Sequence, residues 1–267
     1  METLYRIKEL IQGVPQIVIF LFIALSGLYV FWRGCSESRK NRSSVFDIFL
    51  FSGFFGILVG RIVHIVLEWE IYSSYIWYWI PYEKYGDKVY LFRLLPWRFL
   101  SVWDGGVVIL PVYVAMILSM TFFSLVIKKW RWKHMFLPVY FAPTVMLGAS
   151  FVYVGINSGY TGWIYKGIIL IVALLAYFLI FKFIDKIFKK PVLEKYTIGY
   201  IGIGFVIALS GYISYSYLIS GLSLLETTLV GIFAIWSLVM SGAFIIDLKK
   251  PTVNIERVSS VRSINSK

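Results

Sequence analysis

Charged residues and cysteine are scarce in this chain. Lys, Arg, Asp and Glu make up 15% of its 267 residues, whereas a typical soluble domain has about 25%. With 59% hydrophobic residues and a mean hydropathy of +0.78, the chain is too apolar for an ordinary soluble domain. The single cysteine, Cys35, excludes an internal disulfide and a cysteine-based metal cluster. The sequence therefore predicts a polytopic membrane protein, and we expect neither a cofactor nor a metal site.

Acidic residues are also few, since 14 Asp and Glu oppose 26 Lys and Arg and leave a net charge of +12. In a soluble protein such a balance would suggest a nucleic-acid partner. Here the basic residues cluster between hydrophobic runs, so membrane topology and anionic lipid headgroups explain them better. We therefore expect no nucleic-acid partner.

Seven apolar runs have about the 20 residues needed to cross a bilayer. Their predicted bounds are Val14–Trp32, Val45–Leu67, Val107–Ile127, Met135–Ile156, Gly162–Ile184, Tyr196–Ile219 and Leu224–Ile246. The first run is long for the apolar part of a signal peptide, and no cleavage site follows it. The expected fold class is all-α, with one seven-helix membrane domain over residues 1–250 and a disordered tail over 251–267.

The connections between these runs predict the orientation. Most Lys and Arg residues follow the first, third, fifth and seventh runs, within 33–42, 128–133, 182–195 and 249–267. The other connections are nearly bare of charge or mixed. By the positive-inside rule the amino terminus lies outside and the carboxyl terminus lies in the cytoplasm. Cys35, just past the first run, is then predicted on the cytoplasmic side.

One long external segment, Glu68–Trp103, joins the second and third runs. It is dense in Tyr and Trp with scattered charge, a composition suited to the headgroup region. It is either an aromatic belt that anchors helices or an arm that covers an outward-facing site. The second run also carries Ser52, Gly56 and Gly60 at intervals of four, which predicts close packing against another helix.

Three polar residues near the end of the second run are the first candidates for function. Arg61, His64 and Glu68 stand at i, i+3 and i+7, so a helix places them on one face. A membrane arginine must face protein, water or a phosphate. Arg61 is therefore predicted either to form an ion pair with Glu68 or Asp104 or to bind a lipid headgroup.

Residues 60–62 and 91–106 together carry a family resemblance. Gly60-Arg61-Ile62, then Leu91-Phe92-Arg93, then Val102-Trp103-Asp104-Gly105-Gly106 at the start of the third run, resemble motifs of bacterial prolipoprotein diacylglyceryl transferase. Seven spans in the same orientation agree with that family. Shorter matches follow at Leu147-Gly148-Ala149, Ile156-Asn157, Ile164-Tyr165 and Ile198-Gly199-Tyr200.

The resemblance implies an enzyme of the bacterial cytoplasmic membrane that moves diacylglyceryl from phosphatidylglycerol to the cysteine of a lipoprotein precursor. Arg61 is expected to contact the lipid headgroup, as are Arg98 of the external segment and Asn157. The resemblance leaves Gly60, Trp103, Asp104, Gly105, Gly106 and Tyr165 as motif positions. His64 is the imidazole on the outward half and is the candidate for proton transfer. The Trp103–Gly106 segment is predicted to cap the third helix through Asp104.

Several catalytic positions of the family hold other residues here. The histidine that should follow the Trp-Asp-Gly-Gly motif is Leu110, the motif arginine of the fourth helix is Phe151, and a later histidine is Tyr160. Two alternatives therefore stand beside a divergent transferase. One is an inactive relative that binds phospholipid or a lipidated partner. The other is a small-solute transporter, for which Pro111 and Pro143 hint at broken helices.

Overall fold

Long helices make up most of the computed structural model, which describes residues 14–36, 41–74, 82–85, 87–91, 106–187, 191–218 and 224–249. Each of the seven predicted apolar runs corresponds to one helix, within a few residues at each end. They are α2 (Gln16–Ser36), α3 (Arg42–Leu67), α6 (Ile109–Phe122) with its π-helical extension η3 (Phe123–Ile127), α7 (Trp132–Ser158), α8 (Thr161–Ile187), α9 (Pro191–Leu218) and α10 (Leu224–Lys249).

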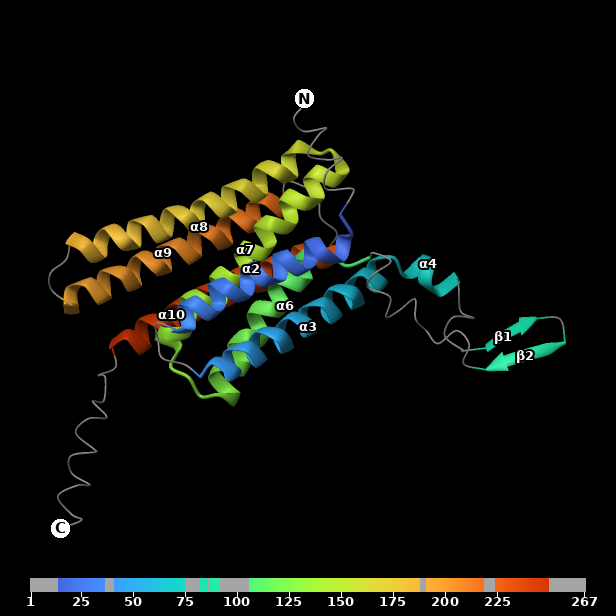
Figure 1. Cartoon of the computed structure of the whole chain (residues 1–267), viewed down its shortest axis with the longest axis horizontal. Helices are drawn as coiled ribbons and strands as arrows, with labels where there is room; N and C mark the ends of the chain where they lie inside the picture. Colours follow the sequence, from blue (N-terminus) through green and yellow to red (C-terminus); the bar gives the residue numbers. More distant parts are fainter. Residues whose placement is uncertain are drawn as a thin grey trace, which may run out of the picture.

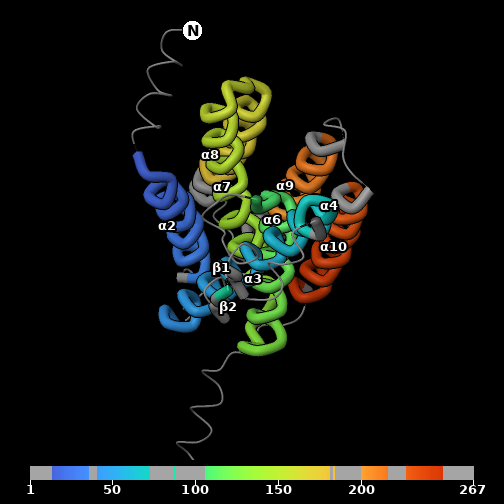
Figure 2. Tube along the Cα trace, turned by 90° about the vertical axis from the view of Figure 1, so that its right-hand side faces the viewer, coloured from blue at the N-terminus to red at the C-terminus, as the bar shows by residue number. Residues whose placement is uncertain are grey.

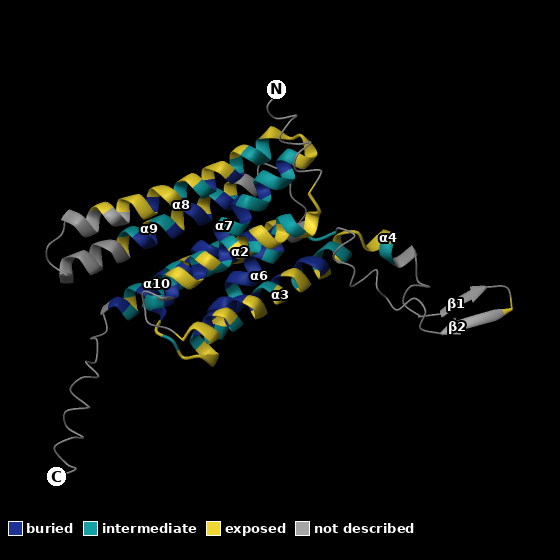
Figure 3. Cartoon of the chain, in the orientation of Figure 1, coloured by how far each residue is buried: buried dark blue, intermediate teal, exposed yellow. Residues whose placement is uncertain are grey.

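Six of these helices are long and apolar enough to cross a membrane, namely α2, α3, α6 with η3, α7, α8 and α10. Large apolar side chains cover their outer faces, as Phe22, Phe54 and Leu179 show with more than two thirds of their surface exposed (Figure 3). Such faces are stable in lipid and not in water. The chain is a multi-pass membrane protein whose helical part is all-α, as predicted.

α7 lies at the centre of the bundle (Figures 1 and 2), with α2, α8 and α6 against it and α3 against the far side of α6. The interior of the bundle is rich in aromatic side chains. Phe136 of α7 stacks on Phe244 of α10 with 4.5 Å between ring centroids. Phe141 of α7 meets Tyr177 of α8 edge to face. α7 remains one continuous helix through Pro138 and Pro143.

Small residues bring the helix backbones close together, which confirms the packing predicted for the second run. On α3, Ser52 is fully buried, and a Cβ atom at Gly56 would lie 2.9 Å from the carbonyl oxygen of Val112 on α6. Gly60 faces Val112 as well. On α2, a Cβ atom at Gly34 would lie 2.7 Å from the Pro138 ring of α7. Each larger residue would push two helices apart.

Consecutive helices alternate in direction, so the basic ends gather at one end of the bundle (Figure 1). α2 ends there with Arg33, α3 begins there with Arg42, and the connection from η3 to α7 carries Lys128 and Arg131. The opposite end holds the end of α3 and the short helix α4 (Trp69–Ser74).

The segment between α3 and α6 contains a β-hairpin that the all-α prediction lacked. Strands β1 (Tyr82–Tyr85) and β2 (Lys88–Leu91) pair antiparallel, with Tyr82 opposite Leu91 and Tyr85 opposite Lys88. The pairing of Tyr85 with Lys88 leaves a connection of two residues, the commonest length in a β-hairpin. Residues 75–81, 92–105 and 251–267 lie outside the described residues, so the predicted lid and disordered tail stay predictions.

α6 begins at Ile109, later than the sequence predicted. Its N-cap is Val108, which provides no side-chain cap, so Asp104 is not the N-cap residue. The helix starts later because the chain still follows an extended path at Val108, whereas the contacts predicted for Asp104, which lies outside the described residues, stay predictions. In that path the Val108 N–H donates to the carbonyl oxygen of Gly60 at 3.3 Å. This bond ties the start of α6 to the end of α3.

Candidate functional site

Arg61 is the buried cation of the described chain, with 7% of its surface exposed near the end of α3. Its Nη1 atom donates a hydrogen bond to the carbonyl oxygen of Gly106 at 2.9 Å. A guanidinium at this depth is costly unless its donors are satisfied. The contact fixes the side chain across 45 residues of sequence, between α3 and the approach to α6.

Gly106 makes that contact possible through its backbone. Its φ of +77° lies in the left-handed region that side chains other than glycine rarely adopt. A Cβ atom here would also lie 2.5 Å from Arg61 Nη1 and would collide with His64 Nε2. The close approach of Arg61 and His64 thus explains why the second residue of the Gly105-Gly106 pair is a glycine. Gly105 lies outside the described residues.

His64 pairs with Glu68, one helical turn further along α3. Its Nε2 atom lies 3.4 Å from Glu68 Oε2. The imidazole is mostly buried, whereas the Glu68 side chain is 47% exposed. The predicted Arg61–Glu68 ion pair is wrong among the described residues, because the i, i+4 spacing of His64 and Glu68 gives the shorter contact. An imidazole with a carboxylate beside it is the common arrangement for moving a proton.

Tyr72 of α4 completes the cluster and was not among the predicted site residues. Its ring centroid lies 5.8 Å from Arg61 Cζ, within the range of a cation–π contact. The same ring meets the His64 imidazole edge to face at 6.0 Å. The signal in the sequence was the position four residues after Glu68, but one Tyr among many in the aromatic segment did not stand out. We call Arg61, His64, Glu68, Tyr72 and Gly106 the α3-end cluster.

The other predicted site residues fall elsewhere or outside the described chain. Asn157 is exposed in the last turn of α7, and Tyr165 is 66% exposed on α8. Within the described ranges no hydrogen bond joins either residue to the α3-end cluster. Gly60 is buried against α6. Arg98, Trp103 and Asp104 lie outside the described residues, so their predicted roles stay predictions.

Of four positions that hold catalytic residues in the resembled family, two lie in the apolar core here and two are exposed. Leu110 is fully buried and Phe151 is 2% exposed. Tyr160 is exposed between α7 and α8. Gly159, in place of the family's glutamate, ends α7 with φ +72°. None of these four residues offers a charge, so the chemistry of the site depends on the α3-end cluster.

Comparison with models of protein families, with curated proteins and with solved structures gave no match to this chain. The functional argument therefore rests on the geometry of the cluster. It combines a fixed guanidinium, an aromatic ring over it, and an imidazole beside a carboxylate. The guanidinium suits a phosphate, with which it can form two parallel hydrogen bonds.

Proposed function

We propose that this chain is a divergent membrane protein of the prolipoprotein diacylglyceryl transferase type, which binds phosphatidylglycerol by its phosphate at the α3-end cluster. The observation that carries the proposal is the buried Arg61, held by the Gly106 carbonyl under the Tyr72 ring. Arginine is kept at such a depth when it has a partner of opposite charge or a functional ligand.

The depth of Arg61 supports a lipid phosphate as that ligand. A helical rise of about 1.5 Å per residue puts Arg61 roughly 28 Å along α3 from Arg42. The hydrocarbon core of a bilayer is about 30 Å thick. The two arginines are therefore about one hydrocarbon thickness apart, so that each can reach one layer of lipid phosphates with its long side chain. The proposal includes seven spans, with α9 as the seventh, and an external amino terminus in the bacterial cytoplasmic membrane.

The cluster contains the groups that the transfer would use. The cysteine thiol of the acceptor loses its proton to His64, and Glu68 stabilises the imidazolium that forms. The thiolate attacks the carbon of the diacylated glycerol that is bonded to the phosphate oxygen. The C–O bond to the phosphate breaks, a C–S bond forms, and glycerol phosphate leaves with its negative charge against Arg61. His64 then returns the proton to solvent.

A second candidate is an inactive relative that binds the lipid without turnover. The burial of Leu110 and Phe151 favours it, because those core positions cannot take up the family's polar groups without repacking. The transporter alternative has less support. The broken helices that it needs are not found in α7, which is continuous through Pro138 and Pro143.

Complementation separates the first two candidates. The chain is expressed in bacterial cells depleted of their own diacylglyceryl transferase, and mature lipoprotein is measured by its shift on a gel. The proposed enzyme restores maturation, and His64→Gln abolishes it. His134→Gln is the matched control, because this second histidine lies in the first turn of α7, at the other end of the bundle. Failure of the wild-type chain, expressed at a normal level, would leave the inactive lipid-binding relative.

A further inference from the structure

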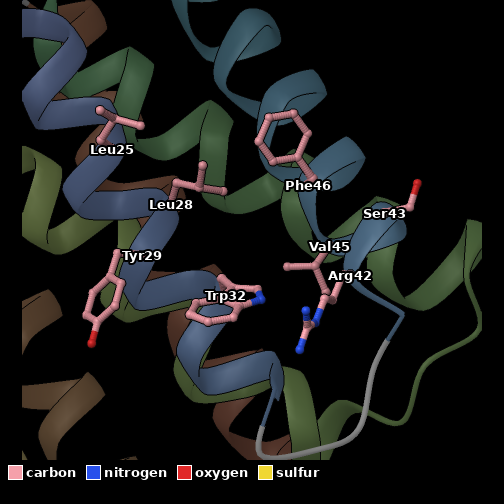
Figure 4. A pocket seen from close by; sticks show the side chains of 8 residues that line it. All are labelled: Leu25, Leu28, Tyr29, Trp32, Arg42, Ser43, Val45 and Phe46. Carbon is pink, nitrogen blue, oxygen red and sulfur yellow. The ribbon is translucent and has the colours of Figure 1, made fainter.

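A groove of about 540 Å³ lies between α2 and α3, at the end of the bundle opposite the α3-end cluster (Figure 4). This volume is within the roughly 300–1,000 Å³ of typical ligand pockets. One face of α2 lines it at helical spacing, and the first turns of α3 line the other side. The lining residues are Leu25, Leu28, Tyr29, Trp32, Arg42, Ser43, Val45 and Phe46.

The groove exists because α2 and α3 pack on different partners. α2 packs along α7, where Gly27 and Gly34 allow close approach to Met146 and Pro138. α3 packs along α6, and the close contacts are at Gly56 and Gly60. The two helices therefore meet each other less extensively, and the space between them is open to the surrounding lipid.

The groove is apolar along its length and cationic at one end. Leu25, Leu28 and Phe46 form its apolar walls, and the Arg42 side chain extends into the gap toward the Trp32 ring (Figure 4). Arg42 is exposed, and in the part of the chain that the structure describes it has no acidic partner. The first turn of α3 carries no acidic residue either. Arg33 stands nearby in the last turn of α2, and in the sequence the connection between the helices adds Arg39 and Lys40 against one acidic residue, Glu37.

We propose that this groove binds one anionic phospholipid, with an acyl chain between α2 and α3 and the phosphate against Arg42. An apolar channel that ends at an arginine has the shape and charge of an amphiphile with one negative head. A phosphate there pairs with the guanidinium. A zwitterionic lipid gains less, because its ammonium group would face the local excess of cations.

This site is separate from the proposed function. Arg42 and Arg61 are roughly 28 Å apart along α3, by the helical rise of about 1.5 Å per residue. The groove therefore takes its lipid from the other leaflet, the one that faces the basic connections. A lipid held there would fill the space between α2 and α3 and fix the position of α2, whose other contacts are mainly with α7.

The test uses the full chain in phosphatidylcholine vesicles that contain a few per cent of phosphatidylglycerol with a photoactivatable acyl chain. After irradiation, labelled peptides are mapped by mass spectrometry. We expect labelling within residues 25–46, and at least a fivefold loss of it in Arg42→Gln. Arg33→Gln is the matched control, since it removes an exposed cation of the same end that does not line the groove, and it should keep most of the label. Leu28→Trp, which fills the groove, should also lose the label.

Two results would overturn the proposal. One is equal labelling by a photoactivatable phosphatidylcholine, which would show ordinary lipid contact without headgroup selection. The other is a loss in Arg42→Gln no greater than in Arg33→Gln, which would show only a general effect of charge. Arg61→Gln should leave this label unchanged. Loss of the label in that variant would mean that the two sites are not separate.

Discussion

At the scale of single residues, Gly106 connects the polar side chains of the α3-end cluster. Its carbonyl accepts from Arg61, and its Cα faces His64 so closely that a methyl group does not fit. The left-handed φ adds a cost of roughly 1–2 kcal/mol for a residue with a Cβ atom. The backbone at this position is therefore part of the site, although it carries no side chain.

Gly106→Ala should lower the free energy of unfolding by more than that conformational cost, because the methyl group also displaces Arg61 and His64. Gly159→Ala is the matched control, since Gly159 has φ +72° but open space around it. Unfolding of both variants in detergent, followed by helical circular dichroism, measures the difference. Equal destabilisation by the two substitutions would show that the contact with Arg61 and His64 contributes nothing.

The residues of this site could be predicted in part. The sequence put Arg61, His64 and Glu68 on one face of a helix, which is correct, because helical spacing alone determines that. The pairing of His64 with Glu68 was also readable from the i, i+4 spacing. The role of the Gly106 carbonyl could not be predicted from the sequence. Every residue has a carbonyl group, and only the fold determines which one lies next to Arg61. Tyr72 was missed for a similar reason.

At the scale of elements, α7 is capped by a residue from another helix. Its N-cap, Arg131, provides no side-chain hydrogen bond. The backbone N–H of Lys133 instead donates to Asp247 Oδ2 of α10 at 3.0 Å. A carboxylate at a helix start satisfies a free donor and interacts favourably with the helix dipole. This contact and the bond from Trp132 Nε1 to the Met240 carbonyl oxygen join α7 to α10.

Asp247→Ala should therefore destabilise the protein by about 1 kcal/mol, the usual value for loss of a cap. Asp247→Asn retains an acceptor oxygen and should lose less. Chemical unfolding of the three proteins in the same detergent gives the comparison. If alanine and asparagine are equally destabilising, the hydrogen bond is not the source of the effect and the charge is.

The helices were predicted well because apolar runs of span length have few alternatives in a membrane. The hairpin Tyr82–Leu91 was not, since Tyr and Trp are common both in strands and at bilayer surfaces and so hide the alternation of a strand. The start of α6 was misplaced because the apolar residues Val107 and Val108 continue the run, although the backbone at Val108 is extended.

At the scale of the whole molecule, the orientation in the membrane is predicted from charge. Testing it by thiol labelling requires a cysteine whose reactivity is not limited by burial in the protein. Cys35 is fully buried, with its Sγ atom 3.9 Å from Met135 Sδ. Its protection from a thiol reagent would therefore report packing and not the side of the membrane. The sequence could not show this, because the contact joins residues a hundred positions apart.

Single cysteines at exposed positions give the decisive comparison, in a chain with Cys35→Ala. Ser158→Cys at the end of α7 should react with a membrane-impermeant maleimide in intact cells. Arg131→Cys at the start of α7 should react only after the cells are opened. Both positions are exposed and lie at opposite ends of one helix. The opposite pattern would reverse the predicted orientation and put Arg61 in the cytoplasmic leaflet.

The central claim is that Arg61 holds a phospholipid phosphate. The most direct measurement is the phosphatidylglycerol that remains bound to the purified chain, counted by native mass spectrometry for the wild type, Arg61→Lys and Arg61→Gln. Loss of a charge-assisted hydrogen bond costs about 1.5–3 kcal/mol, which corresponds to roughly tenfold or more in affinity. Arg61→Lys should retain little more lipid than Arg61→Gln, because lysine lacks the planar guanidinium group that forms two parallel hydrogen bonds with a phosphate.

Arg131→Gln is the control for the count, because it removes an exposed cation at the other end of the bundle. The account predicts that wild type and Arg131→Gln retain one more phosphatidylglycerol than Arg61→Gln does, with all three proteins folded at the temperature of the measurement. Equal retention by wild type and Arg61→Gln would contradict it, and Arg61 would then be a structural residue that anchors Gly106.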